Sequence, residues 1–204
     1  MARLTAIFLA LALSCRILPA LSMPALGPER AVFLTAFGEF EVGFYSEAAP
    51  KTSRHILRLC QLGAYTGNHF FNVQPDYHVQ VEGVTGGRQS PLSKGIKKLD
   101  RKRMPLEVSE ELVHEAGSVS LAHGGDPDTG GSSFAILLNR APHLDGNYTV
   151  FGQVTRGLGV LYEVEDVETE GDGPVQRPTE RVPIYSTYWY TTEGDGLEAR
   201  CDLE

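Results

Sequence analysis

The chain has 204 residues, of which 42% are hydrophobic and 22% charged, the balance of an ordinary globular protein. No repeat or low-complexity tract is present, which excludes solenoid and fibrous architectures, and we expect one well-buried domain. The formal net charge of -8 is unevenly distributed, because residues 1–28 hold Arg3 and Arg16 but no carboxylate.

The first residues have the layout of a cleavable secretory signal. Arg3 precedes the apolar run Leu4 to Leu13, and the small-residue site Ala20-Leu21-Ser22 follows. We therefore predict a signal peptide at residues 1–22, with an outer limit near residue 28, and a place in the secretory pathway, either the ER lumen or outside the cell. The run is shorter than the roughly 20 residues that cross a bilayer, so we expect no membrane span. A transit peptide leading to an organelle lumen is the alternative.

The first half of the domain alternates strands and one helix. Residues 31–44 predict two strands joined at Gly38-Glu39, with alternating apolar positions that indicate one buried face. A helix of about three turns should begin at Pro50 and end at Gly63, because Pro is tolerated in the first turn and Gly is a common stop. Residues 65–83 predict a second pair of strands around Gln74-Pro75-Asp76.

The second half continues with short strands. Residues 117–122 and 133–138 read as strands on either side of a Gly, Asp and Pro loop. Leu144-Asp145-Gly146 predicts a turn before a strand at 149–154, in which Gly152 suits a bulge or a close backbone approach. A helix over 158–164 and a strand over 178–190 complete the domain. Many short strands with two helices indicate a mainly β fold, a closed antiparallel barrel capped by two α-helices.

A strongly basic segment interrupts this acidic chain. Residues 86–103 contain a single acid, Asp100, among seven basic residues: Arg88, Lys94, Lys97, Lys98, Arg101, Lys102 and Arg103. We interpret the segment as a solvated surface loop, and an anionic partner is the alternative interpretation. Aromatic residues are not interleaved with these cations, so we expect no nucleic-acid binding. The last residues, 191–204, are acidic and polar and predict a disordered tail.

Two further features concern the secretory pathway. Cys60 lies in a helical apolar pattern and is interpreted as a buried apolar residue, while a bridge to Cys201 in an oxidising lumen is the alternative. Asn147-Tyr148-Thr149 is a glycosylation sequon, which requires entry into that pathway and an exposed turn.

Several separated motifs occur together and in a consistent order. They are Ala49-Pro50-Lys51-Thr52, Leu62-Gly63-Ala64-Tyr65, Val79-Gln80, Gly131-Ser132-Ser133-Phe134, Leu144-Asp145-Gly146 and Val150-Phe151-Gly152-Gln153-Val154. Over residues 32–186 the chain resembles the cyclophilin-type peptidyl-prolyl cis-trans isomerases. Its leader and the ending from Arg177 to Tyr190 are similar to a divergent plant-type secretory branch. The resemblance implies an eight-stranded barrel over residues 31–190.

The resemblance also implies a reaction, rotation about X-Pro peptide bonds during protein folding. Amide resonance gives such a bond a barrier of about 18–20 kcal/mol. In the family, an apolar pocket holds the proline ring and an arginine donates a hydrogen bond toward the proline nitrogen, which stabilises the transition state. No cofactor or metal is implied. The expected partners are proline-containing polypeptides, with no nucleic acid, and the expected state is a monomer.

Asn72 stands where the family has its catalytic arginine. The implied groove residues are Phe70, Tyr77, His78, Gln80, Ala122, His123, Ser133, Ala135, His143, Leu144 and Tyr148. In this group Ser133 replaces a glutamine, Ala135 a phenylalanine, and His143 a tryptophan, while Tyr148 replaces a histidine. We therefore expect weakened isomerase activity, and the alternative is an inactive module that binds proline peptides or proteins.

Three other site hypotheses remain open. Arg140 is a candidate to supply the missing guanidinium. His78, His123 and His143 fall at groove positions and could make the groove pH-sensitive or bind a metal. A hydrolase is disfavoured, since no Gly-x-Ser-x-Gly elbow is present and Ser132 and His143 match a triad by residue type only.

Overall fold

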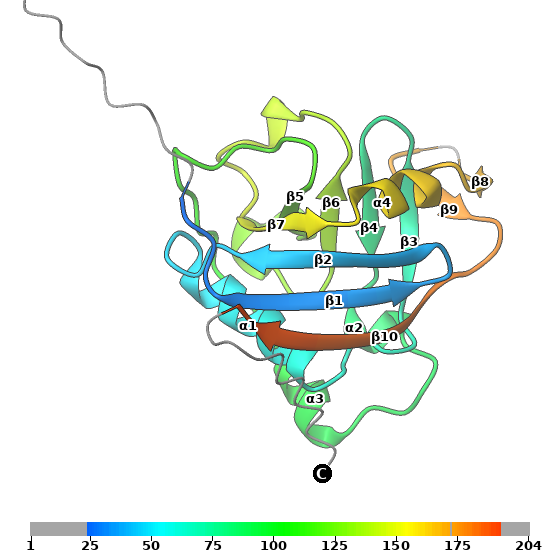
Figure 1. Ribbon diagram of the computed structural model, residues 1–204, viewed down its shortest axis with the longest axis horizontal. Helices are drawn as coiled ribbons and strands as arrows, with labels where there is room; N and C mark the ends of the chain where they lie inside the picture. The colour runs from blue at the N-terminus through cyan, green and yellow to red at the C-terminus, as the bar shows by residue number, and fades with distance from the viewer. Residues whose placement is uncertain (1–23, 172, 193–204) are drawn as a thin grey trace, which may run out of the picture.

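A computed structural model describes residues 24–171 and 173–192. They form a closed antiparallel barrel of eight strands in the order β1-β10-β3-β4-β6-β5-β7-β2 (Figure 1), which confirms the predicted fold. The predicted signal peptide, Cys15, Cys201 and the acidic tail after Thr192 lie outside the described residues. Within those residues, no helix is long and apolar enough to cross a membrane.

The barrel strands have four to ten residues; two pairs of consecutive strands are joined by tight turns, and the others are joined by longer segments. Their bounds are β1 (Glu29–Thr35), β2 (Gly38–Phe44), β3 (His69–Gln74), β4 (His78–Val81), β5 (Ser118–Leu121), β6 (Phe134–Leu137), β7 (Val150–Arg156) and β10 (Val182–Thr191). Alternate side chains of these strands fill the interior, where Phe33 stacks on Phe40 with ring centroids 4.9 Å apart. Tyr65 and Phe134 join this aromatic core, and the Tyr65 hydroxyl donates to the Ser132 carbonyl at 2.7 Å.

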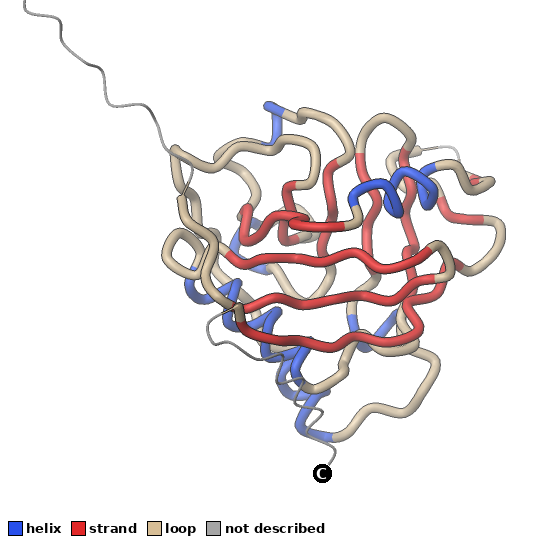
Figure 2. The backbone as a smooth tube through the Cα atoms, viewed as in Figure 1, coloured by secondary structure: helices blue, strands red, loops and turns tan. Residues whose placement is uncertain are grey.

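Two helices match the predicted ones and lie on opposite sides of the barrel (Figure 2). The first, α1 (Pro50–Gln61), has Pro50 in its first turn and ends before Gly63, whose φ of 59° is the left-handed conformation that glycine adopts at low cost. Its buried face includes Ile56, Leu59 and Cys60. Cys60 is therefore the buried apolar residue that the sequence indicates. The second helix is α4 (Leu158–Glu165).

The interpretation of residues 86–103 as a surface loop was wrong, because this segment contains the helix α3 (Lys94–Asp100). The Ser93 hydroxyl caps this helix by accepting a hydrogen bond from the Ile96 N–H at 3.2 Å. Ile96 and Leu99 pack against the core. Five further elements were not predicted: the short helix α2 (Val84–Gly87), the 3-10 helices η1 (Pro127–Thr129) and η2 (Pro142–Leu144), and the two-stranded ribbon of β8 (Thr169–Glu170) and β9 (Arg177–Pro178).

Gly152 lies at a close approach between β7 and β2, as its place in the sequence suggested. A Cβ atom at this position would lie 2.6 Å from the Gly43 carbonyl oxygen, which is closer than real Cβ atoms come to backbone. The register between β5 and β7 also shifts beside it, between Val119 and Ser120. A larger residue at position 152 would therefore push β7 and β2 apart.

Candidate functional site

Register across four neighbouring strands aligns four residues of the site in one row. Asn72 on β3 pairs with Gln80 on β4, Gln80 pairs with Ala135 on β6, and Ala135 pairs with Ser120 on β5. Paired residues in a sheet point to the same face. The row therefore lies on one surface of the barrel, although its members are up to 63 positions apart along the chain.

A cavity of about 140 Å³ lies over this row. Eight of the predicted groove residues line it: Tyr77, His78, Gln80, Ala122, His123, Ala135, Leu144 and Tyr148. Ser120, Leu121 and Leu137 also line it and were not predicted. The signal for Ser120 was its place in the apolar strand 117–122, where a polar residue alternating with Val119 and Leu121 faces the other side.

Aromatic rings form the rim of the cavity. The imidazole of His123 stacks on the ring of Tyr148 with centroids 4.1 Å apart and an interplanar angle of 17°. Tyr77 also lines the cavity, and its hydroxyl lies 3.0 Å from Nε2 of His143. His143 therefore contacts a lining residue but does not itself line the cavity. The cavity is small and mostly bounded by rings and aliphatic groups, which suits a proline-sized apolar group.

Gln80 is held in one orientation within the row. Its Nε2 donates to the Ser133 hydroxyl at 3.0 Å, and Ser133 in turn donates to the Val81 carbonyl at 2.7 Å. Ser133 itself lines a neighbouring cavity of about 440 Å³, which also includes Arg101 and Arg103. The predicted residue Ser133 therefore acts by positioning Gln80.

Asn72 is buried and its carboxamide is fully engaged. Its Nδ2 lies 3.2 Å from Nε2 of His78 and 3.4 Å from both Oε1 of Gln80 and the Pro174 carbonyl oxygen. Its Oδ1 accepts from the Gln176 backbone N–H at 2.8 Å. An amide has two donor hydrogens. None is left to reach a ligand in the cavity, and residues 174–176 cover this end of the site.

Two predicted residues lie elsewhere. Phe70 is fully buried in the core, with its ring 6.2 Å from that of Phe40, so it does not belong to the groove. The reason is the β-bulge between Phe70 and Asn72, which breaks the alternation of side chains on this strand. Arg140 is exposed and its guanidinium lies 3.4 Å from the Glu115 carboxylate, and among the described residues it forms no hydrogen bond or ion pair with a residue that lines the cavity.

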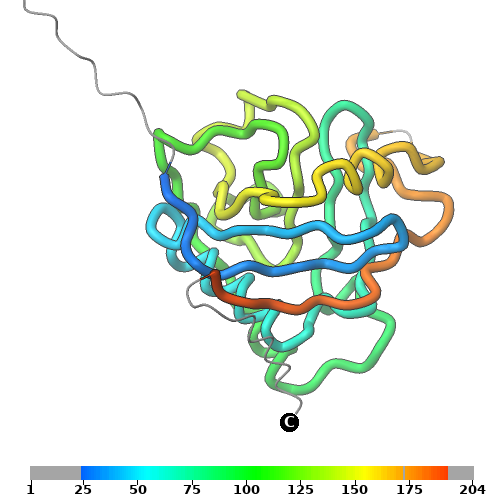
Figure 3. Tube along the Cα trace, viewed as in Figure 1, coloured from blue at the N-terminus to red at the C-terminus, as the bar shows by residue number. Residues whose placement is uncertain are grey.

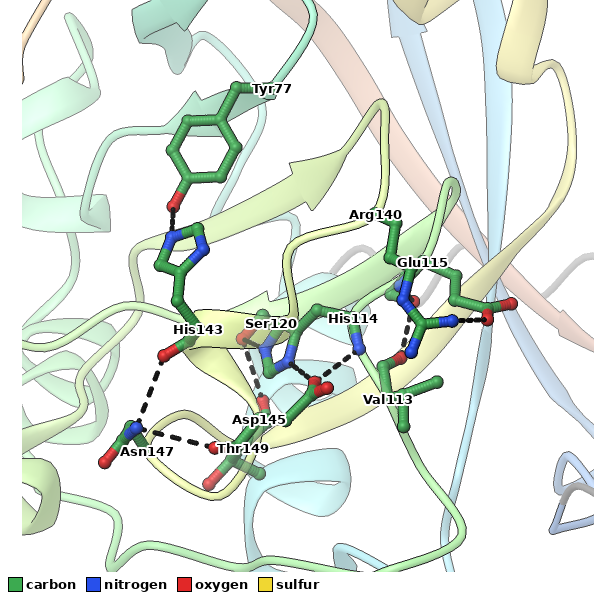
Figure 4. A network of polar contacts seen from close by, with 11 residues as sticks. Tyr77, Val113, His114, Glu115, Ser120, Arg140, His143, Asp145, Asn147 and Thr149 are labelled. Atoms are coloured by element: carbon green, nitrogen blue, oxygen red, sulfur yellow. Dashed lines mark hydrogen bonds and ion pairs between the residues drawn. The ribbon is translucent and has the colours of Figure 1, made fainter.

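The buried residue His114, which the sequence analysis did not single out, connects Asp145, in the turn next to Leu144, with Ser120 on β5 (Figure 4). Its backbone N–H and its Nδ1 both donate to Oδ1 of Asp145 at 2.8 Å, and its Nε2 lies 2.9 Å from the Ser120 hydroxyl. Burial raises the pKa of Asp145, but the hydrogen bonds from His114 outweigh this and leave it below its usual value.

Hydrolytic triads also contain a serine that contacts a histidine, which in turn contacts an aspartate, as Ser120, His114 and Asp145 do here. Here, however, Ser120 is only 3% exposed and forms the floor beneath the cavity. The geometry therefore indicates a structural link. It joins the turn that carries His143, Leu144 and Tyr148 to strand β5, and so sets the width of the groove.

We predict that His114→Ala lowers the free energy of unfolding by about 1–3 kcal/mol, because it removes the hydrogen bonds that the imidazole makes to Asp145 and to the buried Ser120. Proline-peptide binding should weaken as well, since the turn is no longer fixed. Denaturant unfolding and peptide titration measure the two effects. Glu115→Gln is the matched control, because it breaks only the exposed contact with Arg140, worth about 1 kcal/mol or less. Unchanged peptide affinity in His114→Ala would contradict the prediction.

The three groove histidines have separate partners. His78 is paired with Asn72, His123 lies 3.1 Å from the Asn147 carbonyl oxygen, and His143 is paired with Tyr77. Among residues 24–171 and 173–192, no group of three or more His, Cys, Asp or Glu side chains could hold a metal ion. Burial lowers the pKa of His78 to about 4, so its ring is neutral at physiological pH.

Comparison with known proteins agrees with this geometry. The family model described as cyclophilin type peptidyl-prolyl cis-trans isomerase/CLD matches residues 31–188. The chain belongs to the cyclophilin family. This cyclophilin is 43% identical over 175 residues to peptidyl-prolyl cis-trans isomerase CYP23 of Arabidopsis thaliana, covering 86% of this chain and 77% of that protein. It is 33% identical over 165 residues to CYP18-2 of the same plant, covering 80% and 95%.

The fold of this cyclophilin also resembles solved structures. A Cryptosporidium parvum cyclophilin type peptidyl-prolyl cis-trans isomerase has a TM-score of 0.68 at 22% identity, covering 80% of this chain and 98% of that one. A crystal structure of that protein in the presence of the dipeptide Ala-Pro has a TM-score of 0.66 at 23% identity, covering 78% and 96%. At this level of identity the likeness shows the shared barrel.

Proposed function

We propose that this cyclophilin binds X-Pro segments in its groove and isomerises them slowly. The observation that carries the proposal is the state of Asn72. Its side chain stands at the family's arginine position, is only 3% exposed, and directs its donors at His78, Gln80 and Pro174. A proline bound in the cavity would therefore receive no hydrogen bond from this residue.

Binding is supported by what remains of the groove. Tyr77, Leu144 and Tyr148 supply apolar walls, and Gln80 is already oriented by Ser133. Ala135 gives one wall less bulk than the family's phenylalanine would, and the ring of Tyr148 stands on the same cavity. The related Cryptosporidium protein was crystallised with Ala-Pro, which is consistent with proline recognition on this type of barrel.

Isomerisation of an X-Pro bond passes through a twisted amide, and a protein surface complementary to that twisted state is enough to accelerate it. When the X-Pro bond rotates, its resonance is lost and the proline nitrogen gains basic character. A donor aimed at that nitrogen stabilises the twisted state more than the planar one. Without it, the groove can still favour the twisted state through shape and through contacts to the carbonyl, so we expect slow catalysis.

The alternative is a module that binds proline segments without turnover. Measuring binding and isomerisation side by side, with one fluorescent Xaa-Pro peptide, separates the two functions. Binding together with slow, concentration-dependent acceleration supports the proposal. Binding with no acceleration supports the alternative. No binding at concentrations up to several millimolar would contradict both.

We also propose that the chain enters the secretory pathway and carries a glycan at Asn147. Asn147 is exposed and lies next to the groove rim. The rim residue Tyr148 follows it in the chain, and the rim residue His123 contacts the Asn147 carbonyl oxygen through Nε2. A glycan there would stand beside the substrate entrance. Protein made in eukaryotic cells should shift in mass on treatment with an N-glycosidase, and Asn147→Gln should remove the shift. A full-length, unglycosylated chain found in the cytosol would contradict this prediction.

A further inference from the structure

A broad hollow lies between α1 and α3, away from the proline cavity. Its volume is about 930 Å³, and it is lined by Arg58, Leu62, Ser93, Gly95, Ile96, Lys98, Leu99, Arg101 and Lys102. We call these residues the α1–α3 groove. The floor is apolar, because Ile96 and Leu99 pack on the core and Leu62 is 39% exposed. The rim is cationic.

The positive charge of this rim is not neutralised locally. Across the part of the chain that the structure describes, Arg58, Lys98, Arg101 and Lys102 form no salt bridge. Asp100, the acid within α3, does not line the groove, and its carboxylate accepts hydrogen bonds from the hydroxyls of Thr85 and Ser132. Four unpaired cations around an apolar floor attract an acidic segment that carries a few large apolar side chains.

The same chain contains such a segment immediately after β10. Residues 193–204 read Glu-Gly-Asp-Gly-Leu-Glu-Ala-Arg-Cys-Asp-Leu-Glu, with five carboxylates, one arginine and two leucines. The leucines match the apolar floor and the carboxylates match the rim. Charge complementarity therefore favours this segment over the basic or purely polar parts of the chain.

The segment also starts close enough to reach the groove. The backbone N–H of Thr192 donates to the Pro28 carbonyl at 2.9 Å, which fixes the point of departure at the end of β10. Figure 1 shows that end of β10 beside α1, with α3 following below. Twelve residues can extend about 40 Å. A tethered segment of this length has an effective concentration on the order of millimolar at a nearby site.

We propose that residues 193–204 bind in the α1–α3 groove of the same chain. Leu197 and Leu203 cover the floor beside Leu62, Ile96 and Leu99, and the carboxylates pair with the four rim cations. Arg101 lines both this groove and the neighbouring 440 Å³ cavity, so the bound segment would also alter the charge at the edge of the substrate site.

Cys201 allows a direct test in the full chain. Cys60 is 1% exposed and burial raises the pKa of its thiol, so with Cys15→Ser a nitroxide label reacts at Cys201. We expect the label to broaden the amide resonances of residues 58–62 and 93–102 selectively. High salt should restore them, because these ion pairs are exposed to solvent. Broadening that is absent, or spread evenly over the barrel, would overturn the proposal.

Two variants of one helix provide the matched control. Lys98→Glu, which lines the groove, should remove most of the broadening, whereas Lys97→Glu makes the same change of charge outside the groove and should retain most of it. Equal loss in both would indicate non-specific attraction and would contradict a defined site. Broadening of an unlabelled, ¹⁵N-enriched chain mixed with a labelled one would mean binding to a second copy, which also overturns the proposal.

Discussion

The isomerisation rate of this cyclophilin is expected to lie about 10²–10³-fold below that of a family member with arginine at the position of Asn72, by analogy with removal of one transition-state donor. Asn72 is shorter than arginine and uncharged, and its amide hydrogens are used within the site. Proline-peptide affinity should fall less than the rate, because Tyr77, Leu144 and Tyr148 still supply apolar walls, although Ala135 gives one wall less bulk. A protease-coupled assay on an Ala-Pro peptide measures the rate, and titration measures the affinity.

Asn72→Arg should raise this rate at least tenfold. The variant loses the contacts with Gln176 and Pro174 and must displace residues 174–176, so it should also be less stable by about 1–3 kcal/mol. Asn72→Gln is the control, since it lengthens the side chain without adding charge and should not raise the rate. A wild-type isomerisation rate equal to that of arginine-containing relatives would contradict the prediction. An Asn72→Arg variant that isomerises no faster than the wild type would contradict it too.

Stability should fall steeply when the pH is lowered from about 6.5 toward 4. Burial lowers the pKa of His55 to about 4; Lys102 lowers it further, and Asp100 opposes this. Neither ring nitrogen of His55 has a hydrogen-bond partner among the described residues. Burial likewise lowers the pKa of His78 to about 4, next to Asn72 and Tyr77.

The sign follows from proton binding. Between pH 6.5 and 4 the unfolded chain binds a proton at each of these histidines and the folded chain does not, so acid favours unfolding, by about 1 kcal/mol per pH unit for each histidine. Urea unfolding at several pH values should show this slope, and His55→Gln with His78→Gln should flatten it. Some slope should remain, because burial also lowers the pKa of His69 and His114. An unchanged slope in the double variant would refute the assignment.

The sequence predicted the barrel well because its signals are local. Alternating apolar residues mark β1 and β2, Pro50 and Gly63 bound α1, and Gly152 marks the close approach of β7 to β2. Helix α3 was missed because it has only seven residues, includes Gly95, and is dominated by lysines. Its formation depends on the Ser93 cap and on tertiary packing of Ile96 and Leu99, and neither is visible as a helical period.

The site was predictable in composition but not in detail. Eight residues named from family motifs line the cavity, because register carries them to one face. Phe70 was misplaced by a bulge that no sequence pattern announced. The engagement of Asn72 depends on Pro174 and Gln176, about 100 residues later, and the link from His114 to Asp145 and Ser120 also joins three separate segments. Contacts of this kind arise from tertiary structure alone.

The closure of the barrel has a consequence for how the chain is made. The first strand, β1, pairs on one edge with β10, which begins almost 150 residues later, and β10 also pairs with β3 (Figure 3). During synthesis, β1 and β3 therefore remain unpaired on those edges until the ribosome has released residues 182–191. Open strand edges of a nascent chain invite pairing with other chains. Protection by a chaperone during this interval should matter more for this protein than for one whose first strands pair only with each other.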